Sequence, residues 1–528
     1  MRAALTRRGL LLGSAALLST KVSAMPKSSP TVDIVEASAT SLAQSLASGR
    51  LSAEALVQAC LARIAAIDRR GPLLNSVIER NPEALTIARA LDAERKAGRV
   101  RGPLHGLPVL LKDNIATADR MSTSAGSLAL AGMHATRDAH LVKRLREAGA
   151  VVLGKTNLSE WANIRSTRST SGWSSRGGLT RNPYALDRST SGSSSGTAAA
   201  IAASLAPLGV GTETDGSIVS PASINGLVGL KPTLGRISRD GVIPIAHSQD
   251  TAGPMTRSVA DAALLYAAMA GPDAADAITA TAPRAQGGEG TLPAGALKGA
   301  RLGVARAYFI GFDEADAVIE QAIARLRALG AEIIDDAELP AVSYNDAELS
   351  VLLYELKQDL GAWLKTFMPH AKVQTLADVI AFNQAHKAQT MPWFGQELFE
   401  KAQALGGLDS PAYLEALAAC VKGSRTEGLD RVFDKHRLDA LIAPTGGPAW
   451  LIDPIAGDHY GSSFSTPAAV AGYPHLTVPA GWVRGLPLGL SFVGRPFSEW
   501  RLLALGHAFE QATKQRRAPT YPKRSVPA

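Results

Sequence analysis

Hydrophobic positions in the first part of the chain follow helical spacing in some stretches and strand-like runs in others. Apolar residues recur at helical spacing over 41–67 and 82–97, which predicts helices. Between them and the next helix lies a short apolar run, HGLPVLLKDNI, which predicts a strand ending on Lys112. A helix over 139–148 and a buried strand over 151–157 follow. This strand, helix, strand order predicts an α/β fold.

The same alternation continues to the end of the chain. Helices are predicted over 196–206, 259–271 and 318–330, and the segment 345–435 is helical almost throughout. Strands or extended segments are predicted at the positions 206–216, 300–307, 331–339, 438–445, 475–482 and 488–494. Between 271 and 299, Pro, Gly, Thr and Ala indicate a surface loop or linker. We expect one large sheet with helices on both faces and a helical insertion at about 345–435.

The first 24 residues differ from the rest of the chain. A basic start precedes an apolar run over 9–18, and the small residues 22–24 resemble a cleavage site. The apolar run is too short to span a bilayer. Arg7 and Arg8 are typical of a twin-arginine signal. We therefore predict an export signal over 1–24 and a periplasmic protein that does not stay in the membrane; an uncleaved anchor or a basic leader is the alternative.

Charge and composition exclude several classes of protein. The leader holds four basic residues and no acid, so it accounts for half of the net charge of +8 and leaves +4. No Lys/Arg run marks a nucleic-acid groove, and only 5% of residues are aromatic. The sequence has no HExxH, no CxxC and no GxxxxGK[ST], which argues against a zinc site or a phosphate loop. Cys60 and Cys420 lie far apart and are expected to be buried thiols rather than a disulfide.

A serine-rich stretch, STSGSSSGTAAAIAA, covers 189–203. Its composition is typical of a flexible linker, and a glycine-rich turn before a helix can also bind an anion. Gly192, Ser194 and Gly196 match GxSxG, the nucleophile elbow of α/β-hydrolases. The preceding RGGLTRNPYALDR is not an apolar strand, however, which argues against Ser194 as a nucleophile.

A second serine-rich turn, GTETDGSIVSPAS, follows at 211–223. Ser217 comes after a run of small or polar residues there, and the main-chain N–H groups of such a turn can converge on one point. This arrangement places a nucleophile and an oxyanion hole in one loop, with Thr214, Asp215, Gly216 and Ser217 as donors. A purely structural turn is the alternative.

Taken in order, these motifs resemble the amidase signature family. The segment GLPVLLKDNI, the serine-rich stretch and GTETDGSIVSPASINGLVGLKPTLGRIS carry the resemblance, and AAVAGYPHLTVPAG extends it toward the C-terminus. The resemblance implies the amidase signature fold, a large mixed β-sheet core flanked by helices on both faces, with 25–528 as a single domain. It implies no cofactor and no metal. TETDGSIV and KTNLSEWANIR are most similar to bacterial peptide amidases, which remove the C-terminal amide of peptides.

The resemblance also implies a Ser-Ser-Lys triad. Ser217 matches the family's nucleophile, Ser193 its relay serine and Lys112 its general base, and the peptide bond into Ser193 is then cis. A lysine that acts as a base near neutrality needs its pKa lowered from about 10.4 by roughly 3 units. Burial supplies that shift, provided that the neighbouring Asp113 points away from the amine, as alternation along a strand allows.

Four positions depart from the broad family pattern. Glu213, Asp215 and Val219 stand in place of Asp, Gly and Arg, and Ser491 stands where many relatives carry Gln. The first three agree with the peptide-amidase branch. At Asp215, we expect the backbone to bend away from the oxyanion hole without help from glycine.

We therefore expect an amidase that acts on a small or short peptide amide and binds no nucleic acid. Three alternatives remain: a broader amidase or esterase of small acyl substrates, the amidotransferase component that acts on charged transfer RNA, and a non-catalytic peptide-binding relative. His247 and His475 lie in motif-like stretches and resemble candidates for a catalytic base. A Ser-Ser-Lys triad needs no imidazole, so we expect both to be structural.

Overall fold

The computed structural model describes residues 32–283, 290–340 and 344–525, and the chain from Asp33 onward forms one unit. The predicted export signal over 1–24 lies outside the described residues. Among those that are described, no helix is both long and apolar enough to cross a membrane.

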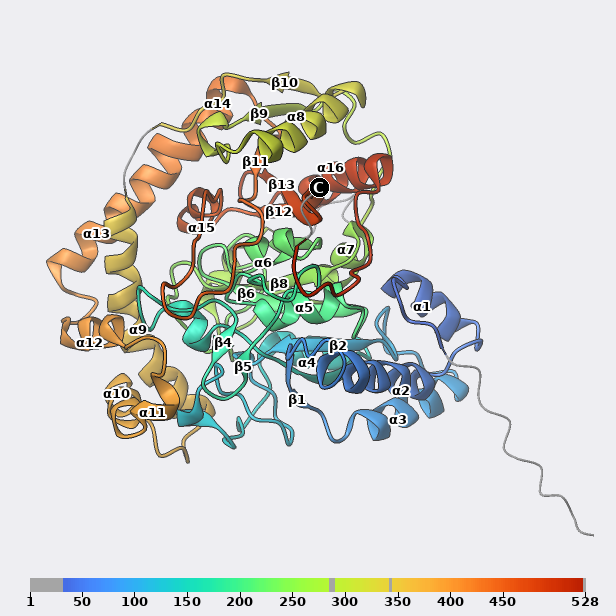
Figure 1. Cartoon of the computed structure of the whole chain (residues 1–528), viewed down its shortest axis with the longest axis vertical. Coiled ribbons are helices and arrows are strands. Elements are labelled where there is room, and N and C mark those ends of the chain that lie inside the picture. Colours follow the sequence, from blue (N-terminus) through green and yellow to red (C-terminus); the bar gives the residue numbers. More distant parts are fainter. Residues whose placement is uncertain (1–31, 284–289, 341–343, 526–528) are drawn as a thin grey trace, which may run out of the picture. The chain divides into compact units, whose positions relative to one another are not determined.

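One sheet of eleven strands forms the centre of this unit (Figure 1). Its strands, from one edge to the other, are β1 (Val77–Arg80), β3 (Val151–Thr156), β2 (Pro108–Lys112), β6 (Leu208–Glu213), β8 (Thr251–Thr256), β7 (Val228–Lys231), β12 (His475–Val483), β13 (Leu486–Val493), β11 (Ala440–Pro444), β9 (Arg301–Val304) and β10 (Glu332–Ile334). β2 runs parallel to β3 and β6, β9 runs parallel to β10 and β11, and the other pairs are antiparallel. The expected large mixed sheet is confirmed. A separate two-stranded sheet joins β4 (Trp173–Ser174) and β5 (Gly178–Leu179).

Helices pack on both faces of the sheet, as predicted. On β12, Leu476 and Val478 contact α16, whereas Thr477 lies on the face that carries Ser223 of α6. Neighbouring residues of a strand point to opposite faces, so α6 and α16 cover opposite sides. The helices outside the segment 345–436 are α1 (Ala39–Ala47), α2 (Ala53–Arg63), α3 (Ala84–Lys96), α4 (His140–Glu147), α5 (Ser195–Ala202), α6 (Val219–Ile224), α7 (Val259–Met269), α8 (Asp313–Ala328), α15 (Thr466–Ala471) and α16 (Glu499–Thr513).

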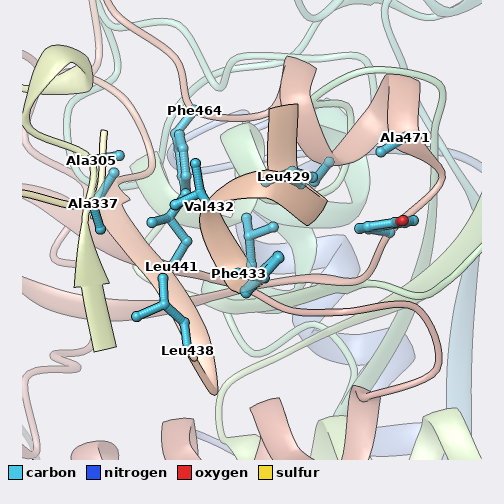
Figure 2. Packing of buried hydrophobic residues seen from close by; sticks show 13 residues of the cluster. Ala305, Ala337, Leu429, Val432, Phe433, Leu438, Leu441, Phe464 and Ala471 are labelled. Carbon is cyan, nitrogen blue, oxygen red and sulfur yellow. The ribbon is translucent and has the colours of Figure 1, made fainter. Parts of the chain in front are cut away.

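The segment 345–436 is helical and contributes no strand to the sheet. Its helices are α9 (Asn345–Phe367), α10 (Leu376–Ala385), α11 (Lys387–Thr390), α12 (Glu397–Ala404), α13 (Pro411–Val421) and α14 (Asp430–His436). Figure 2 shows how the last of them meets the sheet: Val432 and Phe433 of α14 pack in one apolar cluster with Leu441 of β11 and Phe464. This cluster ties the helical segment to the sheet and to the loop that precedes α15.

The sequence located most elements, but one predicted helix is interrupted, and several elements besides β7 and β8 were not predicted: β1, β4, β5, α6 and α15. The predicted helix over 41–67 is interrupted, because Gly49 adopts a positive φ of 71° and the Ser52 side chain caps a new helix by accepting a hydrogen bond from the Ala55 N–H. The strands β7 and β8 were not predicted. Both lie in the middle of the sheet but contain glycine, and β8 also contains Pro254, so neither has the apolar pattern of a buried strand.

Gly253 of β8 provides a test of this close packing. A Cβ atom at this position would collide with the main-chain oxygen of Leu230 and lie 3.0 Å from Ile218. We expect Gly253→Ala to lower the free energy of unfolding by about 2 to 3 kcal/mol, since backbone cannot move aside as a side chain can. Urea unfolding followed by tryptophan fluorescence measures the change. Gly461→Ala is the control, because no atom lies within 4 Å of its added Cβ; equal stability of the two variants would contradict the packing described.

Candidate active site

Lys112, the last residue of β2, reaches into the interior beside the next strand. Its Nζ lies 2.7 Å from Ser193 Oγ, 2.9 Å from Thr212 Oγ1 and 3.1 Å from the Thr212 main-chain oxygen. Lys112 is fully buried, and no ion pair engages it within the described part of the chain. An ammonium, which donates three hydrogen bonds, and a neutral amine, which donates two and accepts one, both fit these contacts, so the protonation state depends on the surroundings.

Burial explains the protonation state of this amine. Removal from water lowers the pKa of Lys112 to about 7, although the negative charges of Asp250 and Glu213 act in the opposite direction. The shift has the direction and approximate size that the sequence led us to expect. A substantial fraction of Lys112 is therefore neutral near pH 7.

Asp113 points away from the amine, as alternation along the strand predicted. Its Oδ2 accepts hydrogen bonds from the Gly126 N–H, at 3.1 Å, and from Arg176 Nη1, at 3.2 Å, and it also bonds to the Ser124 hydroxyl. The guanidinium of Arg176 thus neutralises this carboxylate on the far side of β2. Asp113 therefore does not favour the protonated, charged form of Lys112.

The serine-rich stretch is ordered and buried rather than a flexible linker. The Gly192–Ser193 peptide bond is cis, as the resemblance implied. Ser193 and Ser194 are both fully buried, but they have different partners. Ser193 contacts Lys112, whereas the Ser194 hydroxyl donates to the Thr212 main-chain oxygen at 3.0 Å and accepts from the Thr212 N–H at 3.2 Å. Ser194 thus holds the end of β6 in place, and no strand leads directly into α5, so the nucleophile-elbow interpretation fails.

Ser217 lies in the turn between β6 and α6, next to these serines. Its main-chain oxygen accepts a hydrogen bond of 3.2 Å from the Ser194 N–H, which joins the two serine-rich segments. The turn bends at Gly216, where φ is 74°. No hydrogen bond to a described residue engages the main-chain N–H groups of 214–217, which leaves these donors available. The structure therefore joins Lys112 to Ser193 and places the turn that carries Ser217 against the neighbouring Ser194; no hydrogen bond between the Ser217 and Ser193 hydroxyls is present among the described residues.

Glu213 fixes the shape of this turn. Its Oε2 accepts from the Ile218 N–H at 2.7 Å and from the Val219 N–H at 3.0 Å, so the carboxylate caps the start of α6. Burial raises the pKa of this carboxyl, and the charge of the buried Lys231 amine opposes that rise. The Glu that replaces the family's Asp is thus a structural support for the loop that carries Ser217.

The backbone bend that we expected at Asp215 occurs at the neighbouring Gly216, which has a positive φ, whereas Asp215 does not. Its Oδ2 accepts a 2.6 Å hydrogen bond from the Thr466 hydroxyl. Two residues that sequence reasoning missed also meet the turn: Gln249, whose Nε2 lies 3.3 Å from the Thr214 main-chain oxygen, and Glu348 of α9. Gln249 lies in the segment HSQDTAG, but nothing local marks Glu348.

Neither of the two histidines contacts the three proposed catalytic residues. His475 is buried, with Nε2 2.6 Å from Ser491 Oγ, and burial lowers its pKa to about 3. Ser491, in the position of the family's Gln, belongs to the same buried polar cluster. His247 pairs with Asp359 at 2.8 Å and lies near Glu355. Among the described residues, these three form the one group of side chains close enough together to hold a metal ion. His247 Nδ1 hydrogen-bonds to Asp359, and Glu355 Oε2 lies 3.5 Å from the same nitrogen.

The two cysteines, Cys60 and Cys420, are free and buried. Burial raises the pKa of the Cys60 thiol to about 12, which leaves this thiol protonated and unreactive at neutral pH.

Known proteins resemble this chain in sequence and in fold. The Amidase family model matches residues 55–503. A probable amidase of Arabidopsis thaliana is 40% identical over 97% of this chain and 97% of its own. A glutamyl-tRNA(Gln) amidotransferase component from Symbiobacterium thermophilum is 37% identical over 89% of this chain and 95% of its own.

Solved structures agree with these relatives. Native peptide amidase from Stenotrophomonas maltophilia superposes with a TM-score of 0.88 and 52% identity, covering 92% of this chain and 99% of its own. The peptide amidase PAM in complex with the competitive inhibitor chymostatin superposes with a TM-score of 0.89 at the same identity and coverage. The fold and site therefore define an amide-hydrolysing enzyme. The chain belongs to the amidase signature family.

The lowered pKa of Lys112 predicts an acid limb in the pH profile of amide hydrolysis. An amine accepts a proton only when it is neutral, so kcat/KM should fall about tenfold per pH unit as the pH drops below about 7. Ammonia release measured between about pH 5 and pH 8 checks this. Lys112→Arg, which stays charged, should lose activity at every pH; an unchanged profile in that variant would contradict the assignment.

Proposed function

We propose that this protein hydrolyses the C-terminal amide of peptides, with Ser217 as nucleophile, Ser193 as proton relay and Lys112 as general base. The contact of 2.7 Å between Lys112 Nζ and Ser193 Oγ carries the proposal, because it joins a buried, partly neutral amine to a hydroxyl. The 52% identity to peptide amidase over 92% of this chain supports the substrate class.

In the first half of the reaction, neutral Lys112 accepts the proton of the Ser193 hydroxyl. Ser193 accepts the Ser217 proton at the same time, and Ser217 Oγ forms a bond to the amide carbon. The main-chain N–H groups of 214–217 stabilise the negative oxygen of the tetrahedral intermediate, each donor contributing about 3 to 4 kcal/mol. The proton then returns along the relay to the amide nitrogen, and ammonia leaves as the C–N bond breaks.

The second half repeats these steps with water. Water loses a proton through the same relay and attacks the acyl carbon, and the ester bond to Ser217 breaks as its oxygen regains a proton. The peptide leaves with a free carboxyl group. No step requires a metal or cofactor.

A broader amidase or esterase is the second candidate, because the same triad chemistry cleaves esters. We also propose that the leader over 1–24, with Arg7 and Arg8, exports the folded enzyme to the periplasm. Peptides whose amide ends are exposed outside the cytoplasm would then be the available substrates.

Replacement of the three proposed catalytic residues tests the mechanism. Ser217→Ala should lower kcat for ammonia release by at least about 10⁴-fold, and Lys112→Ala and Ser193→Ala by about 10²- to 10⁴-fold, with circular dichroism unchanged. Ser194→Ala is the matched control; it removes bonds to Thr212 and should lower stability more than activity. Full ammonia release by Ser217→Ala would refute the assignment.

A substrate panel tests the substrate class. Peptide amides, free amino-acid amides, short aliphatic amides and aryl esters are compared by kcat/KM. We expect peptide amides to exceed aliphatic amides by about 10²-fold or more, because contacts along the peptide stabilise the transition state. If short aliphatic amides outpace every peptide amide, the enzyme belongs with the broader amidases.

A further inference from the structure

Two carboxyl groups meet beside the turn that carries Ser217. Asp215 belongs to the turn itself, and Glu348 comes from the first half of α9; the two side chains are within hydrogen-bond reach of each other. Glu348 is buried. The Ser465 hydroxyl also lies beside the Asp215 carboxyl, but Oδ1 of that carboxyl accepts no hydrogen bond from the described residues. Two carboxylates can form a hydrogen bond only if one of them holds a proton. A proton on Glu348 would supply the donor that Asp215 Oδ1 lacks.

The environment favours that proton. Burial raises the pKa of both carboxyl groups, and the charge of Asp215 raises the pKa of Glu348 further. When two like charges share a buried site, one of the groups keeps its proton to a higher pH than an exposed carboxyl does. The pair therefore carries one proton and one negative charge near neutrality.

Further contacts connect Glu348 to the main chain of the turn. The Gln249 amide lies between the two: its Nε2 donates to Glu348 Oε1 at 2.9 Å and to the Thr214 main-chain oxygen at 3.3 Å. On the other side of the turn, the Thr466 hydroxyl donates to Asp215 Oδ2. Residues 214 and 215 thus depend on α9 for their position, and their N–H groups are two of the proposed oxyanion donors.

We propose that Glu348 is a positioning residue for catalysis: a proton that it shares with Asp215 holds the turn in the conformation in which its N–H groups face the substrate. Loss of this proton leaves two adjacent negative charges, which repel each other and move Asp215 away from α9. The inference rests on the proposed Ser217 mechanism and assigns the helical segment a direct part in it.

Other titratable groups lie near this pair, and the test has to distinguish their titration from that of the pair. Lys231 and Glu213 come from β7 and β6, and burial lowers the pKa of Lys231 to about 8. The negative charge of Asp215 or Glu348 also raises the pKa of four other groups, which are Tyr308, Tyr344, Cys420 and Tyr460. Lys231 is the competing source of any loss of activity at high pH.

The sign of the effect follows from the raised pKa. The proton is present at low and neutral pH and leaves as the pH rises through the raised pKa of the pair, so activity falls on the alkaline side. Loss of Lys112 charge acts in the opposite direction, since neutral Lys112 is the active form. The wild type should therefore show a bell-shaped profile of kcat/KM.

The test compares Glu348→Gln with the wild type from about pH 6 to pH 10. A glutamine amide donates to Asp215 at every pH, so E348Q should stay within about threefold of the wild-type optimum and lose the alkaline fall, which we expect to exceed about fivefold in the wild type. E348A, which cannot donate, should lose about tenfold or more in kcat at every pH. Asp346→Asn, at an exposed position of the same helix, is the matched control and should keep the wild-type profile.

Two results would overturn the inference. If E348Q keeps the alkaline fall, another group such as Lys231 causes it; if E348A matches the wild type in kcat at all pH values, the pair does not position the turn. Any amide or ester that the wild type hydrolyses is a suitable substrate for this comparison. Failure of the enzyme to act on peptide amides would refute the proposed substrate class without changing these pH profiles.

Discussion

A fully buried lysine whose charged form is disfavoured is the constraint on which this site depends. Lys112 has no carboxylate partner in the described structure, and its amine hydrogen-bonds there only to Ser193 and Thr212. Such an environment disfavours the ammonium form, and the packing of the large sheet offsets the cost of burying the amine. β2 lies between β3 and β6, so Lys112 at its end has neighbouring strands on both sides. Asp113, the next residue, lies on the opposite face and pairs with Arg176, so its negative charge does not favour the charged form of Lys112.

The rest of the site is organised around the two serine-rich segments that meet this amine. Ser194 ties α5 to the end of β6, and Glu213 caps α6, so the turn between β6 and α6 is held from both ends. The third support comes from a distant part of the chain. Glu348 and Gln249 connect the turn to α9, which makes the helical segment part of the active site as well as a cover for the sheet.

Local patterns in the sequence were enough to predict the parts of the fold and site that depend on neighbouring residues. The strand ending on Lys112, the helix after the serine-rich stretch and the motif around Ser217 are all contiguous, and the family resemblance added their roles. The strands β7 and β8 were not predicted, because they are strands through pairing with their neighbours in the sheet rather than through their own composition. The place of Glu348 beside the turn was not predicted for a similar reason. This residue lies 131 positions after Ser217 in the chain, and only tertiary packing brings it to the turn.

The protonation of Lys112 is the central claim, and NMR titration of protein labelled with ¹³C and ¹⁵N in its lysine side chains measures it directly. The spectrum of Lys112→Met assigns the signal by its absence. The signal should titrate near pH 7, in agreement with an amine that burial has made a base. A Lys112 signal that remains that of an ammonium group up to about pH 10, the range of an exposed lysine, would contradict the account.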